Sequence, residues 1–319
     1  MKYNHTLTAI SLIILCFSIP SHGQKKIHSC ETDRCLIYNK IEELILNINK
    51  PEHREIAISQ YIGTLTATND PRIKTLKENI GFKNTFLSTN FALAGTGLNF
   101  AFRGETSQWV HHYRKISSSS IKEWAEHFYI RHLAYQSIGV NRELESMIQG
   151  MMPTHPLTIE SAAYYYLNSG QPEKLLNLID ETLSNSSYTS QERNHFLFPA
   201  IAIAMQNNYV EISLEIYEKI KSVYGHHIEW DHFHYSVAAL LAIHKGADYS
   251  RDLVLIEDSL MVMSTIPYLY DYFHLKTDND ASQLVVEYML SFIDSYQNTF
   301  GHYAATLSLI KISNYLFII

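Results

Sequence analysis

The chain has 319 residues, of which 46% are hydrophobic and 18% are charged, with 12 glycines and 8 prolines. This composition is too apolar for a disordered chain and too poor in glycine and proline for a loop-rich β protein. The formal net charge of −7, with no run of lysine and arginine, argues against nucleic-acid binding.

Residues 1–23 have the pattern of a secretory signal peptide. An apolar run from Ile10 to Ile19 is too short to span a bilayer comfortably. A proline and small residues follow this run, which predicts cleavage after Gly23. A lipoprotein signal is the alternative because Cys16 is nearby, but Leu15 is bulky where that processing site needs a small residue. The sequence therefore predicts export, with a periplasmic or secreted mature protein.

Two cysteines, Cys30 and Cys35, remain after this cleavage. In an oxidising compartment, two cysteines so close in sequence most simply form a disulfide. The chain-entropy model gives such a small loop a stabilisation of about 2 kcal/mol. Residues 24–35 are thus expected to be an N-terminal segment held by this disulfide, in front of a helical domain at 36–319.

The rest of the chain repeats a turn that is followed by an amphipathic stripe. In SGQPEKLLNLIDETL, residues 169–183, leucine and isoleucine follow Pro172 at the spacing of one helix face. The same pattern begins at six other anchor residues: Pro71, Thr106, Val140, Tyr209, Tyr249 and Ala281. Successive anchors are 32 to 40 residues apart, and another helix-length apolar segment precedes each turn. The pattern predicts a repeating unit of helix, tight turn and helix.

A repeat near 34 residues made of two antiparallel helices resembles the tetratricopeptide family. The resemblance is one of pattern over most of residues 36–318, and NSGQPEKLL and QNNYVEISLEIYEKI carry it most clearly. The small residue that this family has midway along the first helix is present as Gly97, Ala163 and Ala200, whereas Arg131 takes its place in another unit. The resemblance implies an all-α fold, a right-handed α-solenoid of about eight antiparallel helix pairs. Another helical-pair solenoid and a globular helical domain are the alternatives.

The resemblance also implies a concave groove that is lined by the first helix of each pair. In the family's geometry, residues four and eight positions before each turn anchor face this groove. Tyrosine, histidine, asparagine and glutamine suit peptide recognition, because rings add contact area and amides bond to a peptide backbone. The predicted partner-binding residues are His132, Tyr135, Gln136, Glu160, Tyr164, Asn168 and Lys245.

Residues 224–236, YGHHIEWDHFHYS, are rich in side chains that bind metals. They lack the two histidines, four positions apart around a glutamate, that a zinc-protease helix needs. A solvated helix start is the favoured interpretation, and metal binding or metal-dependent hydrolysis at 226–234 is the alternative. Gly95 and Gly97 lack the setting of a dinucleotide-binding loop and are interpreted as points of close helix approach. No catalytic residue, metal or cofactor is predicted.

From His302 to Ile319 the sequence predicts one last helix with an apolar end. This helix is interpreted as a cap on the last pair, with contact to a membrane or partner as the alternative. Taken together, these features predict an exported, non-enzymatic scaffold that binds a protein or peptide partner and no nucleic acid.

Overall fold

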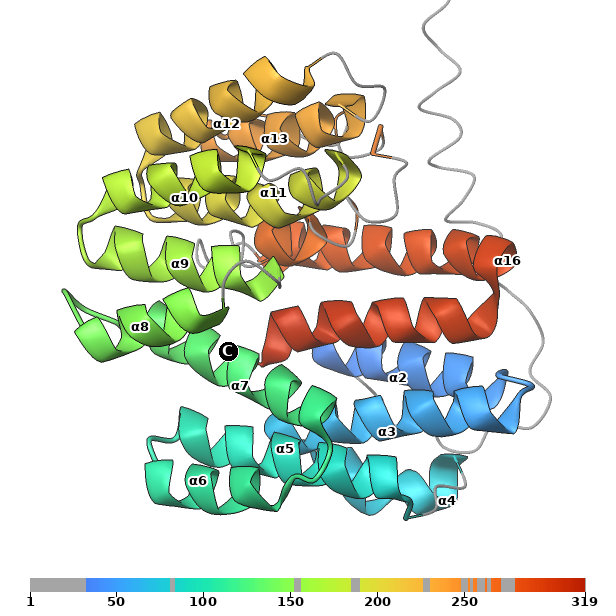
Figure 1. Ribbon diagram of the computed structural model, residues 1–319. Coiled ribbons are helices and arrows are strands. Elements are labelled where there is room, and N and C mark those ends of the chain that lie inside the picture. The colour runs from blue at the N-terminus through green and yellow to red at the C-terminus, as the bar shows by residue number, and fades with distance from the viewer. Residues whose placement is uncertain are drawn as a thin grey trace, which may run out of the picture. The chain divides into compact units, whose positions relative to one another are not determined.

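The chain divides into two units, Met1–Thr32 and Asp33–Ile319. The computed structural model describes residues 33–318 except for a set of short gaps: 81–83, 152–155, 185–189, 226–229, 248–251, 253–254, 257–261, 263–264 and 271–278. The described residues contain thirteen α-helices and one 3-10 helix with the bounds given below, residues 265–270 are helical too, and no described residue lies in a strand, which confirms the all-α prediction (Figure 1). The signal peptide and Cys30 lie outside the described residues, so cleavage after Gly23 and the Cys30–Cys35 disulfide stay predictions.

The helices begin and end with recognisable local signals. Pro51 opens its helix at a position where a missing N–H is tolerated, and Thr85 caps another by a reciprocal bond with Ser88. The elements are α2 (Asp33–Leu46), α3 (Pro51–Ala67), η1 (Pro71–Lys74), α4 (Leu76–Ile80), α5 (Phe86–Phe102), α6 (Thr106–Lys115), α7 (Ser119–Gln136), α8 (Arg142–Met151), α9 (Pro156–Asn168), α10 (Pro172–Ser184), α11 (Ser190–Gln206), α12 (Val210–Tyr224), α13 (Trp230–His244) and α16 (Asn279–Phe317).

Five turns between helices share one hydrogen-bonded geometry. Each contains one residue with a positive φ: Asn69, Gly104, Gly170, Asn208 or Gly246. The residue after it donates its N–H to the carbonyl five positions earlier, as Gln171 does to Tyr166 at 2.7 Å. This is the Schellman motif, in which glycine, and less often asparagine, ends a helix. All five turns lie one to three residues before predicted anchors, so the repeated turn is present at the spacing that the sequence indicates.

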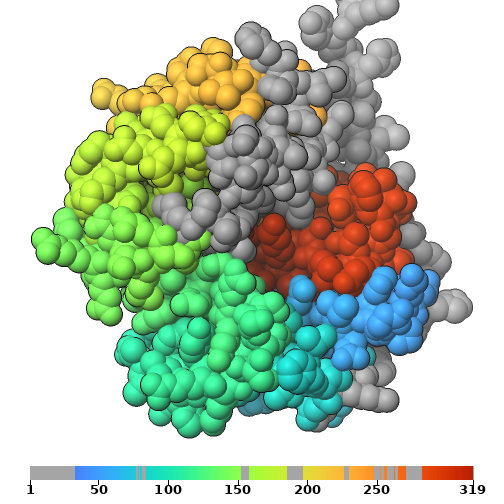
Figure 2. Space-filling view, in the orientation of Figure 1, coloured from blue at the N-terminus to red at the C-terminus, as the bar shows by residue number. Residues whose placement is uncertain are grey.

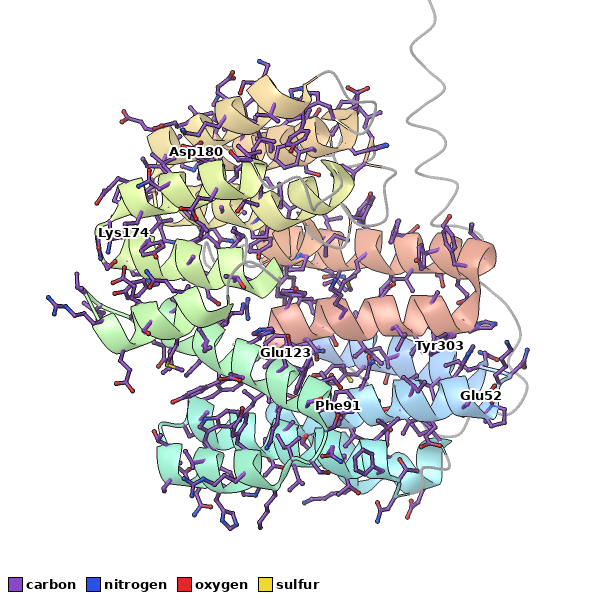
Figure 3. The ribbon with its side chains drawn as sticks, viewed as in Figure 1. Glu52, Phe91, Glu123, Lys174, Asp180 and Tyr303 are labelled. Carbon is purple, nitrogen blue, oxygen red and sulfur yellow. The ribbon has the colours of Figure 1, made fainter. Side chains whose placement is uncertain are left out.

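From α5 to α13 the helices contact their neighbours in chain order. Along the first helices, α5 packs on α7, α7 on α9, α9 on α11 and α11 on α13, and each also packs on the helix that follows it in the chain. Ion pairs join successive second helices: Lys174 of α10 reaches Glu145 of α8 at 2.6 Å, and Lys219 of α12 reaches Asp180 of α10 at 2.9 Å. Figure 3 labels Lys174 and Asp180 on α10. Ion pairs near the surface are weak because water screens them, so apolar packing dominates these contacts.

Glycines let α3, α5 and α6 approach closely. A Cβ atom on Gly95 would collide with the carbonyl oxygen of Gly63 and the hydroxyl of Thr66. A Cβ atom on Gly97 would lie 2.9 Å from the ring of Trp109. The interpretation of Gly95 and Gly97 as points of close helix approach is confirmed.

The last element, α16, is a helical hairpin. Gly301 has non-helical backbone angles, and the chain folds back there in Figure 1. As a result, residues on both sides of the turn lie beside α2: Asp294 is 2.8 Å from the amine of Lys40, and the Phe317 ring centre is 5.7 Å from that of Tyr38. The predicted C-terminal helix is therefore present. It packs on α2 and α3 at the start of the domain, a contact that the sequence analysis did not predict.

Candidate functional site

The predicted partner-binding residues separate into a buried and an exposed group. Those inside the protein are His132, Glu160 and Tyr164. Those at the surface are Tyr135, Gln136 and Lys245, with Asn168 half-buried between the groups. A partner cannot touch the buried group while the fold is intact. The structure thus corrects the expectation that all seven residues line an open groove.

A buried ion pair joins α7 and α9. The Nε of Arg131 donates to the Glu160 carboxylate at 2.5 Å, and the two side chains are 3% and 1% exposed. Burial disfavours a charged guanidinium, but the Glu160 carboxylate outweighs this effect and raises the pKa of Arg131 above its usual value. The guanidinium carbon also lies 5.8 Å from the ring centre of Tyr315, whose pKa is raised by burial. A permanent positive charge is therefore held inside the protein by one carboxylate.

The same guanidinium holds the end of the chain. Arg131 donates to the carbonyl of Ile318 at 2.9 Å and to that of Tyr315 at 3.4 Å, which are carbonyls that the end of a helix leaves without intrahelical donors. Nearby, the Thr64 hydroxyl donates to the Asn314 side chain at 2.6 Å. In Figure 2 the red surface of α16 is set back beside the green surface of α7. The apolar C-terminal sequence is thus used in packing within the domain, and no described helix combines the length and hydropathy that crossing a bilayer requires.

Apolar side chains are exposed at the turn between α7 and α8. We define the α7–α8 rim as Tyr135, Gln136, Ile138 and Val140. Tyr135 is 43% exposed, Ile138 97% and Val140 64%. Turn residues are usually polar or glycine. The two β-branched apolar residues beside Gly139 could therefore have indicated an exposed apolar surface, which the sequence analysis did not predict.

Two of the predicted residues support the α7–α8 rim from behind. The Asn168 amide donates to the carbonyls of Ala134 at 3.3 Å and Tyr135 at 3.1 Å, and so satisfies the last turn of α7. The ring of Tyr164 meets that of Tyr135 edge to face, with centres 5.3 Å apart. Asn168 and Tyr164 therefore fix the position of Tyr135.

A polar cleft of about 400 Å³ lies between α8 and α10. Its lining residues are Glu145, Gln149, Tyr166, Lys174, Asn177, Leu178 and Glu181. The hydrogen bond from Lys174 to Glu145 raises the pKa of this lysine, whose amine also lies 5.8 Å from the ring centre of Tyr166. The positive charge of Lys174 in this cleft is therefore paired with the carboxylate of Glu145.

The histidine-rich segment is described only in part, because residues 226–229 lie outside the described residues. Asp231 lies in the first turn of α13, as expected for a helix start. The Nδ1 of His234 lies 2.8 Å from the hydroxyl of Tyr217 on α12. Among the residues that the structure describes, no group of three or more histidine, cysteine, aspartate or glutamate side chains is arranged to hold a metal ion. The metal-binding alternative stays a prediction for this segment as a whole.

The chain matches no protein-family model, no curated protein and no solved structure. Its function is therefore inferred from its own repeat and its own surface.

Proposed function

We propose that this protein is an exported, non-enzymatic helical-repeat scaffold, a right-handed α-solenoid of the tetratricopeptide type, that binds a protein or peptide partner. Two features support the solenoid: five turns with the same hydrogen bonds at the repeat spacing, and helix contacts that follow chain order. In such arrays each unit packs on its neighbours, and the stacked units present an extended surface to a partner.

The α7–α8 rim is the observation that carries the binding proposal. Single exposed apolar residues are ordinary, but this rim places a tyrosine and two aliphatic side chains at one turn beside an amide. Tyrosine is a frequent binding anchor, and Tyr164 already holds the ring of Tyr135, which lowers the entropy lost on binding. Lys245 has the same offset from its anchor as Gln136 has, so we place both residues along one edge of the array.

Photo-cross-linking from position 136 in the native envelope fraction tests this proposal. A partner should be captured, and Tyr135→Ala with Ile138→Ala should weaken its capture by roughly 30-fold or more, since losing an anchor typically costs about 2 kcal/mol. Leu214→Ala with Val223→Ala on α12 is the matched control, because it also removes two exposed apolar side chains.

The same preparation tests export and the choice of residues. The mature chain should begin at Gln24. Equal loss of capture in both double variants, or no captured partner, would contradict the proposal. Tyr164→Ala and His132→Ala are unsuitable probes, because both residues are buried and their truncation perturbs the fold.

A further inference from the structure

The C-terminal hairpin has a hinge of one residue. α16 is helical from Asn279 to Phe317 except at Gly301, where φ is 85° and ψ is 166°. This backbone conformation is open essentially only to glycine. If Gly301 alone became helical, α16 would become one continuous helix of 39 residues, about 58 Å long.

The half of α16 after this hinge makes its specific contacts with elements that are distant in the chain. Tyr303 stacks on His53 of α3 with ring centres 4.2 Å apart, and Figure 3 shows Tyr303 near the start of α3. Asn314 accepts the hydrogen bond from Thr64 of α3, and Arg131 of α7 holds the last carbonyls. None of residues 302–318 is exposed. A second copy of the chain presents the same α2, α3 and α7, so all of these contacts can be made between copies.

We infer that the hairpin opens at Gly301 and that residues 302–318 of one copy dock on α2, α3 and α7 of a second copy, giving a domain-swapped dimer. Short hinges promote swapping, and this hinge is one residue long. Because glycine adopts both extended and helical angles, a change at Gly301 alone converts the closed form into the opened form. Here the closed form needs the glycine-only conformation and the opened form needs an ordinary helix.

The surroundings of the hinge fit this partner. Phe300 is 60% exposed and packs on Tyr296 with ring centres 4.5 Å apart, which offers apolar surface where two long helices pass each other. The inference does not depend on the proposed function, because the dimer forms whether or not the rim has a ligand.

Gly301→Ala tests the inference by light scattering after size exclusion. Alanine disfavours the closed hinge and favours a helix, so it should favour the opened form by at least about 30-fold per hinge and the dimer by about 1000-fold. Gly104→Ala is the matched control. Gly104 also has a positive φ and open space around it, but three residues separate α5 from α6 there. We expect Gly301→Ala to raise the dimer fraction above that of the unchanged chain, and Gly104→Ala to leave the dimer fraction as it is in the unchanged chain. A folded Gly301→Ala protein that stays monomeric at its highest soluble concentration overturns the inference.

A disulfide test identifies the segment that is exchanged. Thr64→Cys and Asn314→Cys are placed on separate copies of the Gly301→Ala chain, which are unfolded and refolded together. A covalent heterodimer linked between positions 64 and 314, mapped by mass spectrometry, supports the swap. A dimer without this bond has formed through another surface and overturns the swap. If Gly301→Ala does not fold, the same mixture with glycine at 301 decides the matter: the 64–314 bond between copies supports the swap, and its absence refutes it.

Discussion

Replacing Glu160 by glutamine tests the buried ion pair. The side chain keeps its shape, but the guanidinium of Arg131, 3% exposed, loses its counter-charge. Leaving a buried charge without its partner costs about 3–5 kcal/mol. Since domains are stable by only about 5–15 kcal/mol, this is a large part of the free energy of unfolding. With an unfolding entropy of about 2.1 cal/mol/K per residue, the melting temperature of a chain of this size should fall by roughly 5 to 8 °C.

Thermal and urea unfolding followed by far-UV circular dichroism measure this change. Asp180→Asn is the matched control, because it removes the carboxylate of an exposed pair with an N···O distance of 2.9 Å and should cost less than about 1 kcal/mol. Arg131→Met combined with Glu160→Leu should recover most of the lost stability, since it removes both charges. If Glu160→Gln were no more destabilising than Asp180→Asn, the guanidinium of Arg131 would be in contact with water. That result would refute the burial of this ion pair.

Two further predictions concern packing and pH. Gly95→Ala should destabilise the fold by about 1–3 kcal/mol, because the added methyl group collides with α3. Gly150 in α8 has open space around it, so Gly150→Ala should stabilise the fold by about 0.5–1 kcal/mol. Urea midpoints of the two variants measure these changes, and equal effects would refute the close approach of α5 to α3. Burial raises the pKa of both Tyr38 and Tyr288 from 10.0 to about 12, so the stability that these phenols contribute is complete below pH 10 and is lost as the pH rises towards 12. Urea midpoints should fall as the pH rises across this range, and a midpoint that does not change would contradict the burial of these phenols.

The features that could be predicted from the sequence are local ones. Each of these features depends on residues that are close together in the sequence. They are the apolar stripe of a helix, the glycine or asparagine that follows it, and pairs of small residues. The turns at Asn69, Gly104 and Gly170 could therefore be located, as could the close approach at Gly95. Each depends on a backbone conformation or a contact that only a few residue types allow.

The contacts that close the domain could not be predicted in this way. Thr64 and Asn314 are 250 residues apart in the chain, and periodicity shows which face of a helix is apolar but not which distant helix covers it. The same limit explains the site. Tyr164 has the offset of a groove residue, yet Tyr135 packs on it, and the ring of His132 lies 4.5 Å from that of Phe102. Tyr135 and Gln136, at the end of α7, are exposed and remain available to a partner.

Arg131 takes part in this closure. It stands at a position for which the resemblance to tetratricopeptide repeats predicts a small residue, and its side chain reaches Glu160 on the next first helix and the carbonyl of Ile318. Apolar residues of similar size at both Arg131 and Glu160 would fill the same space with similar stability, because burying two charges offsets much of their attraction. An apolar pair would not, however, distinguish one register of α16 from another. A guanidinium with fixed donors does so, since a helix shifted by one turn leaves a buried donor without its carbonyl. We therefore interpret Arg131 as the residue that fixes the register of α16 against α7.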